Sequence, residues 1–403
     1  MPSTRRHVLA LTGVAVAGSV VPTREAGETA TTGGVDWPMA RRDPAGTGTH
    51  PTATGPRTDV DIAWQYSSSN AAGRAVPPIL LDGTLYVTHT GLVALDSATG
   101  SVQFERGGRY RSTPASVESP IYTTETLAVT DSTGVVGLNA GGGLTVPGVN
   151  RSVGVQRWRG PDAAGSGFVG QPTAADPVTV GGTVYAAPPG TGAVVALDAN
   201  DGSVSWRQRP RADETTSADI NRPAVDGDTV FVTNWPYQVT AYGTEAGTQR
   251  WQRELAEQML LAPVATDHGV VVQTRNGVSL LDSADGATIW DRSLDANATD
   301  GAPAVADGHV FLADSQGELH ALDLATGESL WSTEFGGETT PVVADGVVYA
   351  VESRHTLVAI DAVSGERRFT FEPESYPISS PIVGAGRLYL STRRGVLALE
   401  EAA

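Results

Sequence analysis

Residues 321–331 read Ala-Leu-Asp-Leu-Ala-Thr-Gly-Glu-Ser-Leu-Trp, and their skeleton recurs about every forty positions from Leu85 to the C-terminus. The skeleton is Ala, an Asp two residues later, a Gly six residues later, and a Trp or Phe ten residues later. Other full copies begin at Ala94, Ala196 and Ala359, and weaker copies begin at Ala241 and Leu280. A fixed period of this length predicts a repeat architecture.

Each repeat carries the signals of a four-stranded antiparallel sheet. A Pro and a short apolar step come first, followed by a turn that is usually Asp-Gly and by a β-branched or aromatic run. The Ala-x-Asp and Trp segments supply the third and fourth strands. Gly provides the positive φ that such turns require, whereas Pro, which cannot donate to a ladder, suits the start of a strand. The period therefore predicts an all-β chain built from β-propeller blades.

The prolines that lead the repeats set the number of blades. Successive spacings of 40, 40, 38 and 40 residues separate Pro223, Pro263, Pro303, Pro341 and Pro381. The earlier units are led by Pro77 or Pro78, by Pro114 or Pro120, and by Pro172. We therefore predict an eight-bladed propeller of four-stranded antiparallel blades.

The last repeat lacks its outer strand, because the chain ends soon after Glu400 without another Trp. A strand of the required pattern lies near the N-terminus, at residues 61–66, and contains Trp64. We predict that this strand completes the eighth blade. Closure of this kind removes an unpaired sheet edge between the first and last blades, and such edges promote aggregation.

The spacing Ala-x-Asp-x-x-x-Gly-x-x-x-Trp resembles the tryptophan docking motif of the pyrroloquinoline-quinone-like (PQQ-like) repeat family, over roughly residues 35–403. The stretch from Asp36 to Gly48 also resembles a lead-in common in that family. The resemblance implies either a quinoprotein dehydrogenase or a scaffold similar to the propeller lipoprotein of the outer-membrane barrel-assembly machinery, to which it is closer. Membership of a fold does not choose between these functions.

The repeated aromatic residues have a structural and a functional interpretation. One large ring per blade is distributed around the propeller, so the rings cannot converge on one ligand. We predict that each ring docks against the neighbouring blade. These structural docking residues are Trp64, Phe104, Trp158, Trp206, Trp251, Trp290, Trp331 and Phe369. The Asp of each turn is expected to cap backbone amides.

Charge and composition restrict the function further. The chain has 45 acidic and 27 basic residues, and every basic residue other than His is Arg, which gives a formal net charge of −18. This charge disfavours binding to nucleic acids and to anionic membranes. The absence of Cys excludes disulfides, thiolate metal sites and lipid attachment at an N-terminal Cys. An acidic, Lys-free composition is typical of halophilic proteins, and a genome rich in G and C would also replace Lys by Arg.

If the surface is adapted to salt, lowering the salt concentration should unfold the protein. At 1 M salt the Debye length is only about 3 Å, so the repulsion among acidic side chains is screened. We expect the circular dichroism spectrum to lose its β-sheet signal below a few hundred millimolar salt, where the Debye length approaches about 10 Å. An unchanged spectrum there would contradict the interpretation.

Residues 1–34 are predicted to be separate from the propeller, which occupies residues 35–403. Arg5 and Arg6 precede an apolar run that ends at Val21, as in a twin-arginine export signal, and a polar linker follows. The apolar run has about 14 residues, whereas a membrane span needs about 20. We therefore expect an exported protein at the cell surface or outside the cell, with no transmembrane span.

Residues suited to catalysis or metal binding are few. The family's quinoprotein enzymes, as the resemblance implies, hold the quinone beside adjacent cysteines and bind Ca²⁺ through carboxylate and amide oxygens. Only Asn234, next to Trp235, resembles the metal-ligating Asn, and no Glu and Asp match the other ligands. The histidines show no metal spacing, and His309 and His320 are expected on different blades. We predict no catalytic residue, no metal site and no cofactor.

Two Asn-x-Ser/Thr sequons are candidate N-glycosylation sites. Asn150 lies in a Gly-rich insertion that interrupts the second repeat, and Asn297 lies between the fifth and sixth repeats.

Taken together, the sequence favours an exported, non-enzymatic and monomeric propeller that binds protein partners at the cell surface. The first alternative is a PQQ- and Ca²⁺-dependent dehydrogenase of alcohols or sugars. The second alternative is a sensor or binding protein that takes a small ligand in its central channel.

Overall fold

The computed structural model describes residues 36–68, 75–88, 91–145, 152–164, 174–210, 220–235, 237–255, 260–294, 297–298, 301–337 and 339–403. The predicted signal and linker, residues 1–34, and the sequon at Asn150 lie outside the described residues. In the part of the chain that is described, every regular element is a β-strand, and no helix is long and apolar enough to cross a membrane.

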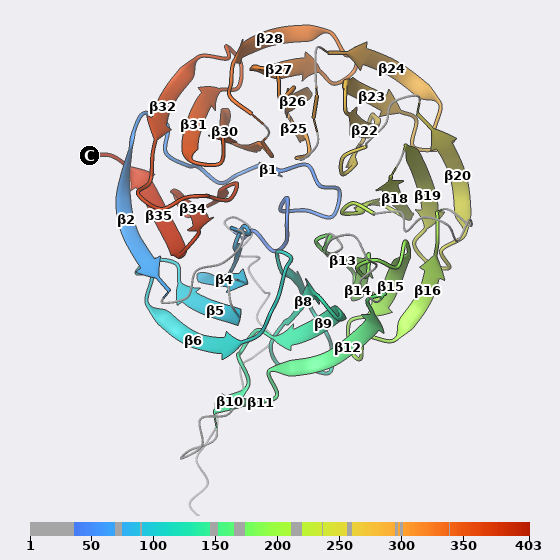
Figure 1. The fold of residues 1–403 in the computed structure, drawn as a ribbon, viewed down its shortest axis with the longest axis vertical. Coiled ribbons are helices and arrows are strands. Elements are labelled where there is room, and N and C mark those ends of the chain that lie inside the picture. The colour runs from blue at the N-terminus through green and yellow to red at the C-terminus, as the bar shows by residue number, and fades with distance from the viewer. Residues whose placement is uncertain are drawn as a thin grey trace, which may run out of the picture. The chain divides into compact units, whose positions relative to one another are not determined.

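The described strands form eight four-stranded antiparallel sheets arranged as the blades of a ring (Figure 1). In each blade the strand order runs from the channel to the rim. The first four blades are β3 (Ile79–Leu81), β4 (Thr84–Thr88), β5 (Gly91–Asp96) and β6 (Val102–Gly107); β7 (Ala115–Val117), β8 (Thr126–Asp131), β9 (Gly134–Asn139) and β12 (Gln156–Asp162); β13 (Val178–Val180), β14 (Thr183–Ala186), β15 (Val194–Asp198) and β16 (Val204–Gln208); and β17 (Ala224–Asp226), β18 (Thr229–Asn234), β19 (Gln238–Gly243) and β20 (Gln249–Glu254).

The remaining blades repeat this order. They are β21 (Val264–Thr266), β22 (Gly269–Thr274), β23 (Gly277–Leu281) and β24 (Thr288–Ser293); β25 (Ala304–Ala306), β26 (His309–Ala313), β27 (Glu318–Asp323) and β28 (Ser329–Glu334); β29 (Val342–Ala344), β30 (Val347–Glu352), β31 (Thr356–Asp361) and β32 (Arg367–Phe371); and β33 (Ile382–Gly384), β34 (Arg387–Thr392), β35 (Gly395–Glu401) and β2 (Val60–Ser67). A two-stranded hairpin, β10 (Leu144–Thr145) and β11 (Ser152–Val153), occupies the insertion in the second blade.

The eight-bladed all-β prediction and its mode of closure are confirmed. β2 pairs antiparallel with β35, with Trp64 opposite Ala398 and Tyr66 opposite Val396. One proline was assigned wrongly: the third blade begins after Pro177, since β13 starts at Val178, and not after Pro172. The insertion in the preceding repeat interrupts the period from the N-terminal side, but Pro177 lies closer than Pro172 to the usual spacing before Pro223.

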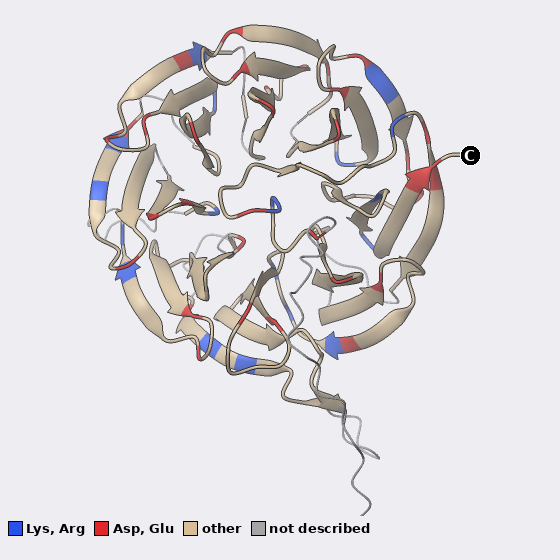
Figure 2. Cartoon of the chain, turned by 180° about the vertical axis from the view of Figure 1, so that it is seen from behind, with Lys and Arg blue, Asp and Glu red and all other residues tan. Residues whose placement is uncertain are grey.

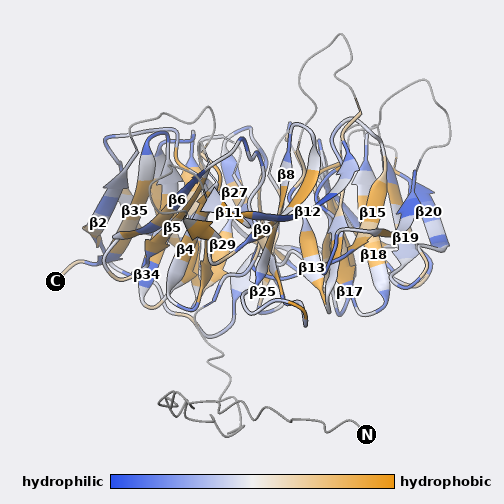
Figure 3. Cartoon of the chain, turned by 90° about the horizontal axis from the view of Figure 1, so that it is seen from below, coloured by the Kyte–Doolittle hydropathy of each residue, from blue (hydrophilic) through white to orange (hydrophobic). Residues whose placement is uncertain are grey.

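Hydrophobic clusters lie between neighbouring blades. One cluster joins Phe311 and Ala321 of the sixth blade to Val348 and Val358 of the seventh. Seen from the side, apolar residues occupy the strands in the middle of the blades, and hydrophilic residues are more frequent on the outer strands and at the two faces (Figure 3). Each blade therefore stabilises the next by burying apolar surface, which is the main favourable contribution to folding.

The ring has two faces, which are formed by different turns. The turns between first and second strands and between third and fourth strands lie on one face. The turns between second and third strands, together with the segments that lead from one blade to the next, lie on the other, which we call the connection face.

Residues 36–50 cross the channel and join the blades from inside (Figure 1). β1 (Thr49–His50), at the end of this segment, pairs in parallel with β29. Backbone carbonyls of the segment accept N–H groups from the first strand of six blades, at Leu80, Ser116, Val225, Ala265, Val305 and Val343. We call residues 36–50 the channel segment.

Candidate functional site

Each repeated Trp of the described blades bridges two blades. The indole N–H of Trp331 donates to the carbonyl of Ala362 at 3.1 Å, and the ring lies against Gly365 of the next blade. Gly365 has a φ of +75°, and a Cβ there would lie 2.8 Å from the indole, so the turn requires glycine. Equivalent donations run from Trp64 to Ser97, Trp158 to Ala199, Trp206 to Thr244, Trp251 to Ser283, and Trp290 to Leu324.

The two phenylalanines in this series face irregular neighbours. Phe104 faces Gly142 in the second blade, where an insertion replaces the usual turn. Phe369 faces the eighth blade, whose third and fourth strands, β35 and β2, come from opposite ends of the chain and share no turn. A ring without an N–H needs no carbonyl acceptor, which accounts for Phe at these two positions. These eight rings therefore do not meet at a common point.

A cavity of about 310 Å³ in the middle of the ring is the place where side chains from many blades do meet. Its walls come from the segments that precede the first strands, including Asp176, Arg222, Ala302, Thr340 and Ser380. Its floor is part of the channel segment. The cavity therefore belongs to the connection face and lies on the molecular axis.

Arg41 fastens the channel segment to the ring. Its guanidinium donates to the carbonyls of Pro341 at 2.6 Å and Pro303, and also to those of Gly46 and Thr47 in its own segment. Burial, reinforced by the nearby charge of Arg222, lowers the pKa of Arg41 to about 9. Figure 2 shows basic residues beside an acidic one on the segment that crosses the middle of the ring, whereas many turns of the blades carry acidic residues.

Arg222 holds the channel segment from the fourth blade. Its Nη2 donates to the carbonyl of Asp43 at 2.6 Å, and its Nη1 donates to that of Pro223 at 3.0 Å. The residue is only 6% exposed, and its Nε has no hydrogen-bond partner among the described residues. Burial lowers the pKa of Arg222 to about 10, against the opposing charges of Asp43 and Asp176.

These cavity residues are not among the predicted site residues, although the sequence contains a signal for them. In six of the eight blades the residue before the leading proline lines the cavity: Asp176, Arg222, Ala262, Ala302, Thr340 and Ser380. In two blades this position carries a charge, which is unusual next to a buried strand. The prolines served only as markers of where each repeat begins.

The candidates for cofactor binding are Asn234, the last residue of β18, and Trp235, which follows it in the turn to β19, and neither lines the cavity. Asn234 is fully buried, and its Nδ2 donates to the carbonyl of Trp235 at 3.2 Å and to Gln238 at 3.4 Å. Trp235 is 49% exposed on the connection face. The structure does not bring either residue to the cavity, and no carboxylate is among the hydrogen-bond partners of Asn234.

One group of described side chains has ligand atoms close enough to hold a metal ion. Asp314, Glu318 and His320 place one ligand atom each within 4.8 Å of one another, on the turn between β26 and β27. The Asp314 carboxylate lies 3.0 Å from His320 Nε2 and accepts three backbone N–H groups, including that of Glu318. These hydrogen bonds already satisfy the buried carboxylate of Asp314, so its burial does not require a metal ion. The expectation that His309 and His320 belong to different blades was wrong, since β26 and β27 are neighbours.

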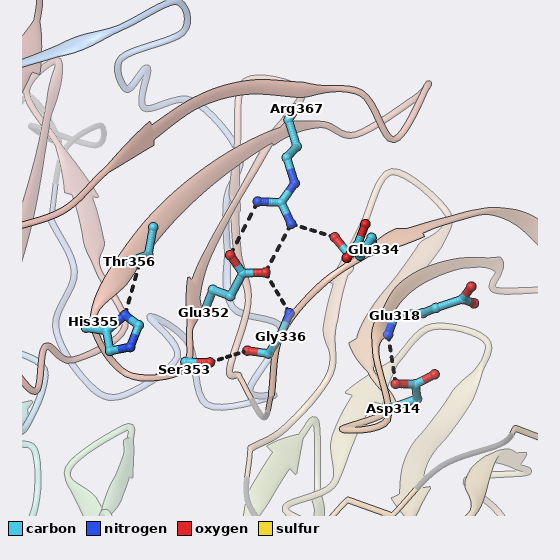
Figure 4. Close-up of polar contacts among 9 residues, drawn as sticks. All are labelled: Asp314, Glu318, Glu334, Gly336, Glu352, Ser353, His355, Thr356 and Arg367. Carbon is cyan, nitrogen blue, oxygen red and sulfur yellow. Dashed lines mark hydrogen bonds and ion pairs between the residues drawn. The ribbon is translucent and has the colours of Figure 1, made fainter.

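Polar contacts connect the sixth and seventh blades beside this turn (Figure 4). Glu352 accepts from Arg367 at 3.0 Å and from the backbone N–H of Gly336 at 2.6 Å. Arg367 also donates to the carbonyl of Glu334, the last residue of β28. Glu352 and Arg367 pair with each other and with the backbone of Glu334 and Gly336, so the contacts hold the blades together.

The second sequon lies on the connection face. The side-chain oxygen of Asn297 accepts from Arg275 Nε at 2.6 Å, and its backbone N–H donates to Asp314. Glycosylation of Asn297 would break the first of these bonds, and modification there remains a prediction.

Comparison with known proteins identifies the family. The family model described as outer membrane protein assembly factor BamB matches residues 190–280 and 274–402, which together span more than half of the 403 residues. The chain belongs to the PQQ-like propeller family, in its BamB-like branch. Curated relatives of this BamB-like chain include the BamB proteins of Yersinia pestis, 31% identical over 167 residues, and Escherichia coli K12, 31% identical over 148 residues.

These alignments are partial. They cover 38% and 36% of this chain, and 42% and 36% of the two relatives, so the chain matches about two fifths of the length of those proteins. Among solved structures, BamB from Moraxella catarrhalis matches with a TM-score of 0.62 at 16% identity, covering 85% of this chain and 99% of that one. Quinohemoprotein alcohol dehydrogenase from Comamonas testosteroni matches at 0.67 and 14% identity, covering 91% and 81%. Likeness at these identities shows the fold alone.

Proposed function

We propose that the protein is an exported, non-enzymatic propeller that binds other proteins at the cell surface. The observation that carries this proposal is the BamB-like family match, since those relatives are named as assembly factors. The channel segment supports the proposal, because it fills much of the axis with the protein's own backbone. The surfaces left for partners are then the two faces and the outer wall.

The connection face is the better candidate for the binding surface. Trp235 is 49% exposed on it, and Tyr376, in the segment between the seventh and eighth blades, is 62% exposed. Tyr376 packs edge-on against His355 with ring centroids 6.1 Å apart. Exposed aromatic side chains are enriched among the residues that dominate the free energy of protein–protein binding.

Replacing both aromatic residues tests location and partner binding together. Intact cells expressing the protein are treated with a crosslinker that does not cross membranes, and the captured proteins are identified and quantified. We expect Trp235→Ala with Tyr376→Ala to reduce the recovery of each specific partner at least tenfold, which corresponds to about 1.4 kcal/mol or more. Val363→Ala changes a residue on the opposite face that is 78% exposed. This variant should capture the same partner proteins as the parent, in similar amounts.

Two results would count against this proposal. Absence of crosslinking in intact cells together with crosslinking in lysates would place the protein inside the cell. Equal recovery by the parent and the double variant would exclude the connection face as the binding surface.

The quinoprotein alternative is not supported by the residues present. The quinone-binding enzymes of the resemblance need amide and carboxylate ligands that meet at one Ca²⁺, but Asn234 is buried outside the cavity and bonded to Gln238. The cavity walls carry Arg41, Arg222 and Arg354 against a single acid, Asp176, which is an unfavourable lining for a divalent cation. Titration with the quinone and Ca²⁺, followed by a dye-linked alcohol oxidation assay, decides the matter: turnover would establish the enzyme and overturn the proposal.

A further inference from the structure

The central cavity has the opposite charge balance to the whole protein. The chain carries a formal charge of −18, yet the titratable side chains that line the cavity are three arginines and one aspartate. These are Arg41 on the floor, Arg222 on the wall, Arg354 at the seventh blade and Asp176 at the third. The Asp176 carboxylate already accepts the backbone N–H of Thr113 at 2.7 Å. A concave site lined by one sign of charge concentrates ions of the other sign.

The two inner arginines lack carboxylate partners. None of the ion pairs found among the described residues includes Arg41 or Arg222. Both guanidiniums donate to backbone carbonyls, which provide hydrogen-bond acceptors but no formal negative charge. Buried charges are normally paired, because an unpaired buried charge is unfavourable. Asp43 attracts both arginines and Asp176 attracts Arg222, but none of these contacts is an ion pair, so an anion in the cavity would supply a direct partner.

Arg222 also has a donor that the fold does not use. Its Nε is buried without a hydrogen-bond partner in the described part of the chain, while Nη1 and Nη2 are engaged. Nε itself has almost no accessible surface, so an acceptor in the cavity would meet Nη1 or Nη2, each of which carries a second N–H beyond the one that bonds Pro223 or Asp43. The carbonyls of Pro223 and Asp43 hold the guanidinium in place, so little conformational entropy would be lost when an acceptor binds.

We propose that the central cavity binds a small multivalent oxyanion, which accepts hydrogen bonds from Arg222 and is neutralised by Arg41 and Arg354. The volume of 310 Å³ equals that of about ten water molecules, at about 30 Å³ each. It therefore accommodates phosphate, sulfate or a short di- or tricarboxylate. The lowered pKa values of Arg41 and Arg222 are consistent with this site, because an anion would favour their charged forms.

Binding is measured on the full chain by titration calorimetry, with phosphate and citrate as separate probes at constant ionic strength. Sodium chloride replaces each probe in one control titration, and glycerol tests the effect of an uncharged molecule of similar size. We expect saturable binding of at least one oxyanion and none of glycerol. The relative affinities of phosphate and citrate distinguish an inorganic from an organic ligand. Because buried charges are screened less than exposed ones, binding should persist in molar salt.

Arg222→Gln removes the charge and the guanidinium donors, and should weaken the binding at least tenfold. Arg292→Gln removes an exposed arginine of the outer strand β24 and is the matched control, with an expected change below twofold. If Arg222→Gln does not fold, as judged by circular dichroism, Arg354→Gln replaces it, with an expected weakening of at least threefold. Absence of saturable binding by either oxyanion, or equal affinity in the parent and the cavity variant, would overturn the proposal.

Discussion

Trp331→Ala is expected to lower the free energy of unfolding by about 3–5 kcal/mol, the usual cost of truncating a large aromatic side chain in a packed site. The indole contacts two blades: it packs on Phe311 of its own blade, with centroids 5.9 Å apart, and on Gly365 of the next. Alanine would leave a gap that rigid sheets on both sides cannot close. Urea unfolding followed by circular dichroism gives the change directly.

Two further substitutions separate the contributions of the ring and its hydrogen bond. Trp331→Phe keeps most of the packing but loses the donation to Ala362, so we expect a loss of about 1 kcal/mol. Leu330→Ala alters the neighbouring side chain, which is 48% exposed, and should change stability by no more than about 0.5 kcal/mol. If Trp331→Ala were as stable as Leu330→Ala, the repeated aromatics would have no docking role.

The fold was predictable because the sequence of each blade carries its own strand and turn signals. The motif from Ala321 to Trp331 encodes a strand, a turn and a strand within eleven residues, and its repetition reveals both the period and the missing outer strand. Errors arose where the period was interrupted. The insertion in the second repeat interrupts the period, and Pro172 was taken in place of Pro177 although Pro177 is nearer to the usual spacing before Pro223. His309 and His320 were separated because their positions along the strands were not considered.

The candidate site was harder to predict than the fold. The channel segment has no periodic pattern, and its bonds join residues far apart in sequence, such as Arg41 and Pro341. A single sequence gives no indication of which blades a non-repeating segment will contact. The wall residues, in contrast, could have been predicted, because the residue before the leading proline occupies an equivalent place in successive blades. Arg222 and Asp176 depart from the small residues at that place in the fifth and sixth blades, Ala262 and Ala302.

Arg41→Ala is expected to destabilise the protein by about 3–6 kcal/mol. Two of the four carbonyls bonded to the guanidinium belong to the sixth and seventh blades, and hydrogen bonds to charged groups contribute about 1.5–3 kcal/mol each. Gly48 must also remain glycine, because its φ is +69° and a Cβ there would lie 2.3 Å from the guanidinium. Arg57→Ala is the matched control: Arg57 pairs with Asp345 on the surface, and such pairs contribute about 0–1 kcal/mol.

Hydrogen exchange would show where the Arg41→Ala variant is weakened. The amides of Val305 and Val343 donate to Thr47 and Gly48 of the channel segment, so they should exchange faster in the variant if Arg41 holds the segment in place. The amides of β4, far from Arg41 in the first blade, should then change less. Uniform acceleration in all blades would instead mean that the ring unfolds as one unit. Unchanged exchange at Val305 and Val343, with unchanged stability, would mean that the backbone bonds alone hold the segment, and that Arg41 serves mainly as a charge in the cavity.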